Sequence, residues 1–294
     1  MKEEIINQLK SLGIKNGDTL FITADLLKVG LFIKDRDTTF RTWFDILISL
    51  VGEQGTLVVP AYTPTFFRFG KSKEFLFKHD SPSTSGSLSV AFSKVSGVLR
   101  STHPSNSCFA YGFNSDYILR DHNEFASSYL PYHKIIELGG KHLMLGCAND
   151  AKLGLMTIHP AQEILGITKK MWQCGLFQTY YFDKNGCKKL FTRRDFGGCT
   201  SFGYKFLGDH IVHNSITFGK TGNGLSGLVD CKKSLNILLN IYKKNPKSFR
   251  CDNHNCPDCW GSPIHLHPFF WIKSILSVIV SKLRKYFTHL IIIK

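Results

Sequence analysis

Short apolar runs of strand length alternate along this chain with longer segments of helical periodicity. The runs with strand character are Thr19–Thr23, Thr56–Pro60 and His142–Gly146. The segments with helical character are residues 3–13, 40–51, 85–92, one that ends at 135–138, and 235–242. Because short apolar strands alternating with amphipathic helices pack as layers, the pattern predicts an α/β fold with an α/β/α core.

A second pattern predicts that the sheet is mixed. Phe177, Thr179 and Tyr181 alternate with more polar residues, and an Asn185-Gly186 turn follows before Leu190 and Phe191. An Asn-Gly pair between two such runs is a strong hairpin signal. We therefore expect an antiparallel hairpin annexed to the core.

A glycine-rich stretch, Gly219–Gly227, resembles a phosphate-binding loop only superficially, because no Gly-Lys-Ser/Thr closes it. We expect a flexible loop at the edge of a substrate site.

The chain divides at residue 246. It has 294 residues, 43% of them hydrophobic, which is enough for one large core with a small appendage. Residues 1–246 carry the alternating pattern, and residues 247–294 carry a cysteine-rich segment followed by an apolar, aromatic and basic tail. We expect one core domain and a C-terminal appendage that contains cysteines and ends in a helical tail.

The segment Leu155–Gly166, LMTIHPAQEILG, places three reactive side chains within seven residues. Pro160 favours a helix start, which would put His159 and Glu163 on one helical face. A histidine held by a carboxylate is suited to act as a general base near neutral pH. The same pair also occurs in purely structural helices, so its meaning depends on the surrounding sequence.

That surrounding sequence resembles the aminoglycoside 3-N-acetyltransferase family over roughly residues 1–245. The resemblance rests on an ordered series: residues 17–22, 23–30, 52–63, 81–86, 100–104, 137–140, 143–147, and Thr157 with His159 and Glu163. The chain departs from the family at two points. Thr, His and Glu are spaced two and four here instead of three and three, so Gln162 occupies the position three after His159, and Leu130-Pro131 stands where the family has Ser-Pro.

The resemblance implies an enzyme that uses acetyl-coenzyme A and transfers the acetyl group directly to an amine. In that reaction His159 would accept the proton of the amine, Glu163 would orient the imidazole, and Thr157 would donate its hydroxyl to the thioester carbonyl. Gln162 competes with Glu163 for the orienting position. A covalent route through Cys147 is the less favoured alternative.

The resemblance also implies a coenzyme A site in three loops. Its residues are Thr23, Ala24, Lys28, Ser83, Ser85, Gly86, Arg100, Ser101 and His103. Residues 83–86 could offer hydroxyl and N–H groups to a phosphate, and Arg100 a planar fork. Alternatively, Ser83 and its neighbours only cap a helix, and His103 is a buried histidine bonded to the backbone.

Charge guides the choice of acceptor. The 37 Lys and Arg residues outnumber the 22 Asp and Glu residues, for a net charge of +15. No nucleic-acid-binding motif accompanies this charge, so we expect no nucleic-acid partner, and the basic residues either attract phosphates or simply make a basic surface. Because acids are scarce, we prefer a nucleotide- or lipid-linked amino sugar of surface polysaccharide biosynthesis as the acceptor. The alternatives are an aminoglycoside, with antibiotic resistance as the result, and a non-catalytic protein that binds acyl-coenzyme A or a membrane.

The N-terminus, Met-Lys-Glu-Glu-Ile-Ile, has no hydrophobic signal region, and nine scattered cysteines suggest free thiols. We therefore expect a cytoplasmic protein, with peripheral contact at the inner face of the membrane as an option. That contact would come from residues 268–294, where basic and aromatic residues flank an apolar face. The alternative is a helix that packs on the core or in a homodimer.

The segment Arg250–Gly261, RCDNHNCPDCWG, is a candidate metal site. Cys256 and Cys259 have Cys-x-x-Cys spacing, and Cys251 and His254 are close in sequence. These four residues could hold a structural zinc ion. A second Cys-x-x-Cys pair is absent, so the sequence leaves open whether the segment binds metal.

Overall fold

The structure, a computed structural model, describes residues 2–30, 35–70, 75–149, 154–266, 268–270, 272 and 276. The helices are α1 Lys2–Ser11, α2 Leu26–Val29, α3 Arg36–Val51, α4 Ser87–Phe92, α5 Ser115–Leu119, α6 Leu130–Glu137, α7 Ile158–Ile164, α8 Leu207–Val212, α9 Cys231–Lys244 and α10 Pro257–Trp260. The strands are β1 Thr19–Ala24, β2 Thr56–Pro60, β3 Phe66–Phe67, β4 Leu76–Phe77, β5 Leu99–Arg100, β6 Cys108–Gly112, β7 Lys141–Leu145, β8 Phe177–Phe182, β9 Lys188–Thr192, β10 Ile216–Thr221 and β11 Gly224–Asp230.

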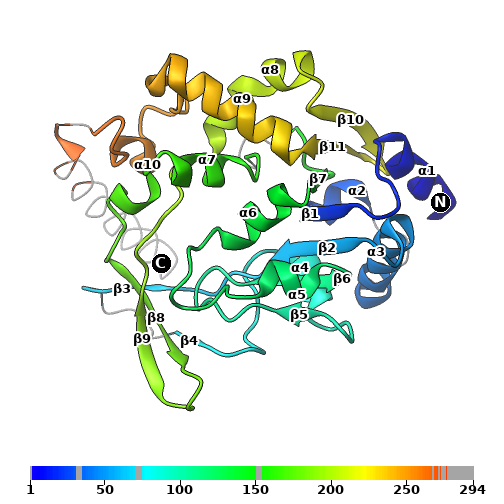
Figure 1. The fold of residues 1–294 in the computed structure, drawn as a ribbon, viewed down its shortest axis with the longest axis horizontal. Helices are drawn as coiled ribbons and strands as arrows, with labels where there is room; N and C mark the ends of the chain where they lie inside the picture. Colours follow the sequence, from blue (N-terminus) through cyan, green and yellow to red (C-terminus); the bar gives the residue numbers. More distant parts are fainter. Residues whose placement is uncertain are drawn as a thin grey trace, which may run out of the picture.

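The main sheet is mixed, as predicted. Among the described residues it has seven strands in the order β10-β11-β7-β1-β2-β6-β5 (Figure 1). Its centre is parallel, because β1 pairs in parallel with both β2 and β7. The flanking pairs β2–β6, β6–β5, β7–β11 and β11–β10 are antiparallel. The three central strands, β1, β2 and β7, are the apolar runs that the sequence predicted, whereas the edge strands are more polar and give a weaker signal.

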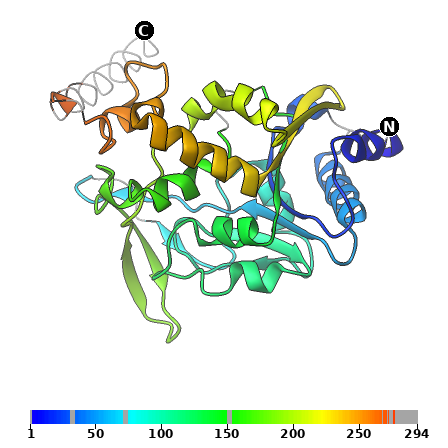
Figure 2. The same cartoon turned by 45° about the horizontal axis from the view of Figure 1, so that its top comes forward.

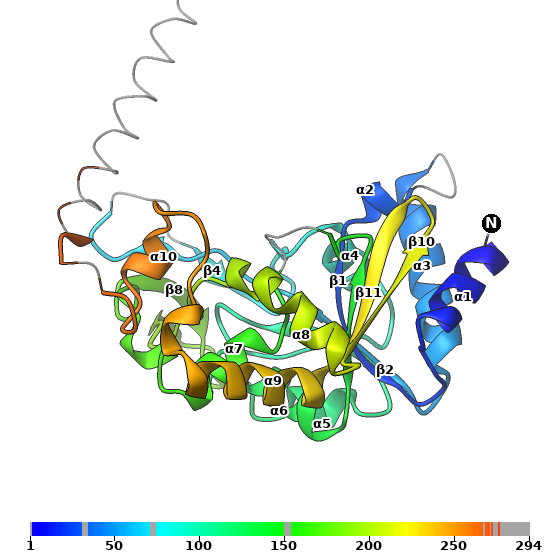
Figure 3. The ribbon, with the colours of Figure 1, turned by 90° about the horizontal axis from the view of Figure 1, so that it is seen from above.

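Side chains that alternate along the central strand β1 join separate hydrophobic clusters on the two faces of the sheet. Leu20 and Ile22 of β1 join a cluster with α1, α3 and α4, whereas Phe21 joins one with α5 and α6. The view along the sheet in Figure 3 shows α1 and α3 on one side and α6 and α9 on the other. This confirms the α/β/α arrangement, which follows from the two-residue side-chain period of strands buried on both faces.

The hairpin predicted around Asn185 and Gly186 is present as β8 and β9, with register Tyr180↔Leu190. It belongs to a second sheet, because β8 also pairs with the short strands β3 and β4. Figure 1 shows this hairpin extending away from the main sheet. The annex thus adds a wall next to the core instead of widening the seven-stranded sheet.

The prediction of a flexible loop at Gly219–Gly227 is wrong. This stretch forms the adjoining ends of β10 and β11 and the turn between them, with Phe218↔Gly227 and Thr221↔Gly224 in register. Gly224 is needed because the neighbouring backbone comes close: a Cβ there would lie 2.8 Å from Gly146 Cα. A Cβ on Gly227 would lie 2.9 Å from Met144 Cε, so the end of that side chain would have to shift. Glycine weakens the strand signal in the sequence, but here it permits close packing.

The first part of the C-terminal segment packs on the core. Phe249 and three cysteines of this segment share a hydrophobic cluster with Phe202 and Leu238. Figure 2 shows this segment continuing from the end of α9. Among the described residues, no helix is both long and apolar enough to cross a membrane. Most of residues 268–294, to which the membrane-surface and homodimer predictions refer, lies outside the described residues, although Phe270 is buried and packs on Trp172.

Candidate active site

A cavity of about 270 Å³ lies at the carboxyl ends of β1 and β2. This is where open α/β sheets bind ligands, because the loops that follow parallel strands converge there. Its polar lining contains no carboxylate, lysine or arginine: the residues are Thr23, Tyr62, Ser85, Ser89, Tyr132, His142, His159 and Thr200. The rest of the wall is largely apolar, so the cavity suits a neutral reacting group such as a thioester.

His159 reaches this cavity from α7, and two elements fix its ring. The ring of Tyr129 stacks on the imidazole with centroids 4.8 Å apart. The backbone of Gly197 also passes so close that a Cβ there would lie 2.0 Å from His159 Nδ1. Only glycine, which has no Cβ, fits at residue 197 while His159 keeps this position.

Gln162, not Glu163, is the partner of His159. Its Oε1 lies 3.2 Å from His159 Nδ1 and accepts a hydrogen bond from Gly198 N, while its Nε2 donates to the carbonyl of Cys199. These two backbone contacts fix the amide orientation, so Nδ1 must donate and Nε2 carries the free lone pair. Burial lowers the pKa of His159 to about 4, which keeps the imidazole neutral at neutral pH.

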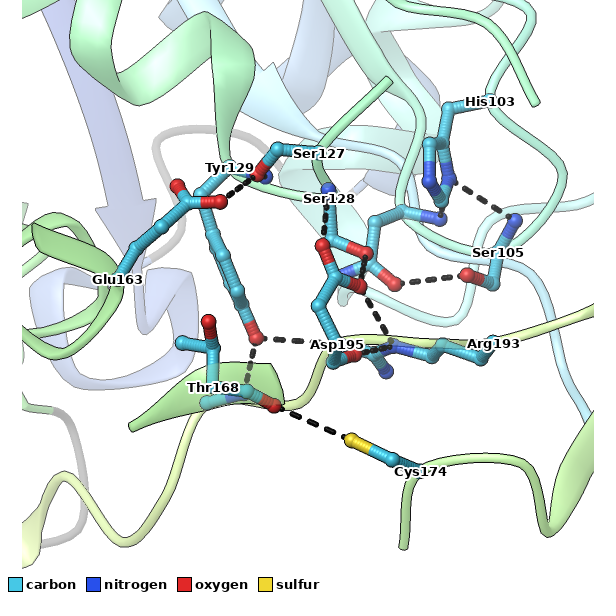
Figure 4. A network of polar contacts seen from close by, with 12 residues as sticks. His103, Ser105, Ser127, Ser128, Tyr129, Glu163, Thr168, Cys174, Arg193 and Asp195 are labelled. Atoms are coloured by element: carbon cyan, nitrogen blue, oxygen red, sulfur yellow. Dashed lines mark hydrogen bonds and ion pairs between the residues drawn. The ribbon is translucent and has the colours of Figure 1, made fainter. Parts of the chain in front are cut away.

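The expected pairing of Glu163 with His159 is therefore corrected. Glu163 shares α7 with His159, but its Oε2 lies 2.8 Å from His133 Nε2. Ser127 Oγ donates to its Oε1, as Figure 4 shows. Burial alone would raise the pKa of Glu163, but the bonds from His133 and Ser127 outweigh it and lower the pKa. The spacing of four residues would allow Glu163 to contact His159, but Glu163 is hydrogen-bonded to His133 and Ser127 instead.

Thr157 does not face the cavity either. It is fully buried, and its Oγ1 lies 2.7 Å from Ser234 Oγ of α9. Residues two apart on a helix point about 200° away from each other, so Thr157 and His159 serve opposite sides of α7. The predicted hydrogen bond from Thr157 to a thioester carbonyl is incompatible with this placement.

A second pocket, of about 560 Å³, begins one helical turn from His159. It is lined by Glu124, Phe125, Ala126, Ser127, Glu163, Lys169, Tyr181, Leu190, Phe191, Thr192, Arg194 and Asp195. Three carboxylates thus gather in a chain that has few. Asp195 is bonded to Ser128 and lies near Arg193 (Figure 4). Glu163 is also bonded, to Ser127 and His133, but each carboxylate oxygen keeps a further lone pair, so Glu163 and Glu124 can still accept from a cationic ligand.

Of the residues predicted to bind coenzyme A, three line the cavity: Thr23, Ala24 and Ser85. Ser83 and Gly86 lie just behind them. Ser83 Oγ accepts from Ser89 Oγ and Ser85 N, and Gly86 precedes α4 with a φ of 94°. Ser85 and Ser89 are in turn bonded to the backbone around β2, so this loop forms a firm wall.

Arg100 is a structural arginine. It is 5% exposed, and its five N–H groups all have acceptors: Ser107 Oγ, Thr63 Oγ1 and the carbonyls of Ala61, His79 and Ser81. Burial lowers its pKa to about 10. No N–H group remains for a phosphate, so the predicted phosphate contact is incompatible with the structure.

The other predicted coenzyme A residues also have different partners. Ser101 is buried between Cys108 N and His122 Nδ1. His103 Nδ1 accepts from Ser105 N and Asn106 N, as the reading of a backbone-bonded histidine predicted. Lys28 forms an ion pair of 3.3 Å with Asp25 on the surface.

Two tyrosines of the cavity carry a feature that sequence reasoning missed. The hydroxyls of Tyr62 and Tyr132 are hydrogen-bonded to each other across the wall. Burial raises the pKa of both, so they keep their protons at neutral pH. The only signal in the sequence was that Tyr62 lies in one of the family-like blocks, residues 52–63, since nothing local links it to Tyr132.

Cys147 is buried beside Thr23, with its Sγ 3.6 Å from the Thr23 carbonyl, and it does not line the cavity. Cys251, Cys256 and Cys259 come together as predicted, but the fourth residue of the cluster is Cys199. His254 is exposed on the turn and is outside the cluster.

A family model described as aminoglycoside 3-N-acetyltransferase matches residues 21–242. The chain belongs to this family. An aminoglycoside N(3)-acetyltransferase III from a Salmonella species is 27% identical over 187 residues, which are 58% of this chain and 63% of that protein. The protein of the same name from Enterobacter cloacae is 26% identical over the same shares. The match therefore spans less than two thirds of the length of these relatives.

Solved structures show the same fold. Aminoglycoside acetyltransferase AAC(3)-IVa, as the apoenzyme, superposes with a TM-score of 0.71 at 19% identity, over 89% of this chain and 95% of that one. AAC-IIIb in a binary complex with CoASH gives 0.69 at 21% identity, over 83% and 96%. AAC-VIa bound to sisomicin gives 0.66 at 19% identity, over 83% and 97%.

These comparisons overturn the preference for a nucleotide- or lipid-linked amino sugar of polysaccharide biosynthesis. The family model, the two curated relatives and the three solved structures named above are all described as aminoglycoside acetyltransferases. The preference rested on the scarcity of acids in the whole chain, and total charge is a poor guide to one pocket: three of those acids line the pocket to which α7 contributes Glu163.

Proposed function

We propose that this protein transfers an acetyl group from acetyl-coenzyme A to an amino group of an aminoglycoside, with His159 as general base. The observation that carries the proposal is the neutral imidazole in the cavity, with its Nδ1 held by Gln162 and its Nε2 left as the acceptor. Family membership supports the reaction class.

The cavity at β1 and β2 would hold the acetyl thioester. Its apolar wall excludes water from the thioester, and its few hydroxyls orient the carbonyl. One hydroxyl of the Tyr62–Tyr132 pair donates to the other, which leaves one proton free to stabilise charge on the carbonyl oxygen. These two phenols take over the role expected of Thr157.

The second pocket would hold the acceptor. An aminoglycoside carries several ammonium groups, and Glu124 and Glu163 offer carboxylates for them. Residues four apart on a helix lie about 5–6 Å from each other, so a cation held at Glu163 leaves a neighbouring amine within reach of His159. The amine attacks the thioester carbonyl, its proton passes to His159 Nε2, and the same proton can then neutralise the departing thiolate of coenzyme A.

Release of coenzyme A thiol tests the proposal. Purified protein is supplied with acetyl-coenzyme A and a panel of aminoglycosides, and the acetylated product is identified by mass spectrometry. His159→Ala is expected to lower kcat about 10²- to 10⁴-fold, the usual contribution of a general base. His213→Ala, at the exposed end of α8, is the matched control and should retain full activity. Turnover that survives His159→Ala would overturn the proposal.

A further inference from the structure

Four cysteines from two distant parts of the chain converge at the active-site loop, residues 197–200, which lies against His159. The sulfur atoms of Cys199, Cys251, Cys256 and Cys259 all lie within 4.8 Å of one another. Cys199 belongs to the loop before α8, and the other three belong to the turn that leads into α10 and to α10 itself. All but Cys199 are buried, and the group sits in the hydrophobic cluster that joins α7, α9 and the C-terminal segment.

The spacing of these sulfurs matches a tetrahedral metal site. Zinc–sulfur bonds of about 2.3 Å place the sulfurs of a tetrahedral site about 3.8 Å apart. The Sγ atoms of Cys251 and Cys259 are 3.6 Å apart, and the backbone N–H of Cys251 donates to Cys259 Sγ at 3.4 Å. Hydrogen bonds of this kind stabilise sulfur that carries negative charge. Disulfides would instead divide the four sulfurs into two close pairs of about 2.05 Å.

We propose that Cys199, Cys251, Cys256 and Cys259 bind one structural zinc ion that fastens the active-site loop to the C-terminal segment. Four thiolates with no open position are the ligands of closed, structural zinc sites, and soft sulfur selects zinc over magnesium, calcium or manganese. His254 takes no part, because it is exposed and lies outside the group.

The zinc ion would act on the active site through the residues next to Cys199. The carbonyl of Cys199 accepts from Gln162 Nε2, and Gly198 N donates to Gln162 Oε1. Gly197 lies against His159, and Thr200 lines the cavity. Residues 197–200 therefore set the ring position and tautomer of His159, and the metal would hold this loop at one end. This second step rests on the proposed function, whereas metal binding itself does not.

Metal content is the first test. The full chain, purified without chelator, is expected to contain one zinc ion per chain by inductively coupled plasma mass spectrometry. Exchange with Co²⁺ should give a thiolate-to-cobalt charge-transfer band and the visible bands of tetrahedral Co²⁺. A chain that contains no zinc, contains iron, or has an intact mass lowered by disulfide formation would overturn the proposal.

Variants then assign the ligands. Cys199→Ser is expected to weaken zinc binding at least about tenfold in a chelator competition. The controls His254→Ala and Cys187→Ser, both at exposed residues, should keep full zinc and the cobalt spectrum. Zinc that is lost in His254→Ala and kept in Cys199→Ser would contradict the assignment. If Cys199→Ser does not fold, the cobalt spectrum and zinc affinity of the wild-type chain still decide whether four thiolates bind the metal.

The coupling to His159 has its own measurement. Cys199→Ser should lower kcat for acetyl transfer, while the KM for acetyl-coenzyme A changes little. A folded Cys199→Ser chain that has lost its zinc and keeps full kcat would contradict the coupling. A wild-type chain that binds one zinc through Cys199 but acetylates no aminoglycoside would overturn the proposed function and leave the metal site intact.

Discussion

The two pockets that adjoin α7 are built from opposite chemistry. The cavity at the ends of β1 and β2 is lined by apolar groups, hydroxyls and neutral histidines, whereas the pocket beside the β8–β9 hairpin contains five charged residues. One helix supplies a key residue to each, His159 to the cavity and Glu163 to the charged pocket. The difference teaches that the fold separates an uncharged cavity from a charged pocket, which the proposed reaction uses for the thioester and for the amine, and that one turn of α7 separates the two residues that this helix supplies.

The largest effect after loss of His159 itself is expected at Gln162. Gln162→Leu removes the acceptor of His159 Nδ1 and both contacts to the loop, so the ring loses its fixed orientation. We expect kcat to fall about 10- to 100-fold, as a small misplacement of a catalytic group does. Steady-state kinetics measure this. Gln178→Leu, another buried glutamine bonded to Thr192, should leave kcat unchanged. Equal losses in both variants would mean that only stability is affected.

A smaller effect, confined to one substrate, is expected at Glu163. Glu163→Gln keeps the shape of the side chain and removes its charge from the second pocket. We expect the KM for an aminoglycoside to rise about tenfold, the equivalent of about 1.4 kcal/mol, with no change in the KM for acetyl-coenzyme A. Asp116→Asn, at an exposed acid on α5, is the matched control. A rise in the KM for acetyl-coenzyme A would show that the two pockets are not divided in this way.

The smallest effect is the shape of the pH profile. Because burial lowers the pKa of His159 to about 4, the imidazole stays unprotonated from about pH 5 upward. The profile of kcat/KM for acetyl-coenzyme A should therefore show no inflection near pH 6.5, where an exposed histidine titrates. Loss of activity should begin only as the pH falls toward 4. An inflection at 6.5 that disappears in His159→Ala would contradict the buried, neutral state.

Much of the fold could be predicted because its signals are local. The central strands are short apolar runs, and the hairpin β8–β9 carries its own Asn-Gly turn. The strands β10 and β11 escaped prediction because their glycines are required by neighbours far along the chain, such as Met144 and Gly146. A glycine that permits close approach of another segment interrupts the alternation of apolar and polar residues by which a strand is recognised in a sequence.

The site was only partly predictable for the same reason. His159 stood out through its neighbours in the sequence, but its partner was decided between Gln162 and Glu163 by other elements. Ser127 and His133 bind Glu163, and the loop at 198–199 holds Gln162. Arg100 was misjudged in a similar way, because its five acceptors come from separate loops that the sequence does not bring together.

The sequence by itself determined the layered α/β fold, the family, and the histidine at the site, since each depends on residue types in local order. Only the tertiary structure decided which carboxylates form the charged pocket, which side chain orients His159, and that Cys199 joins three cysteines more than fifty residues away. These depend on contacts between segments distant in the chain, where hydrogen-bond geometry and burial select one partner among several that spacing alone allows.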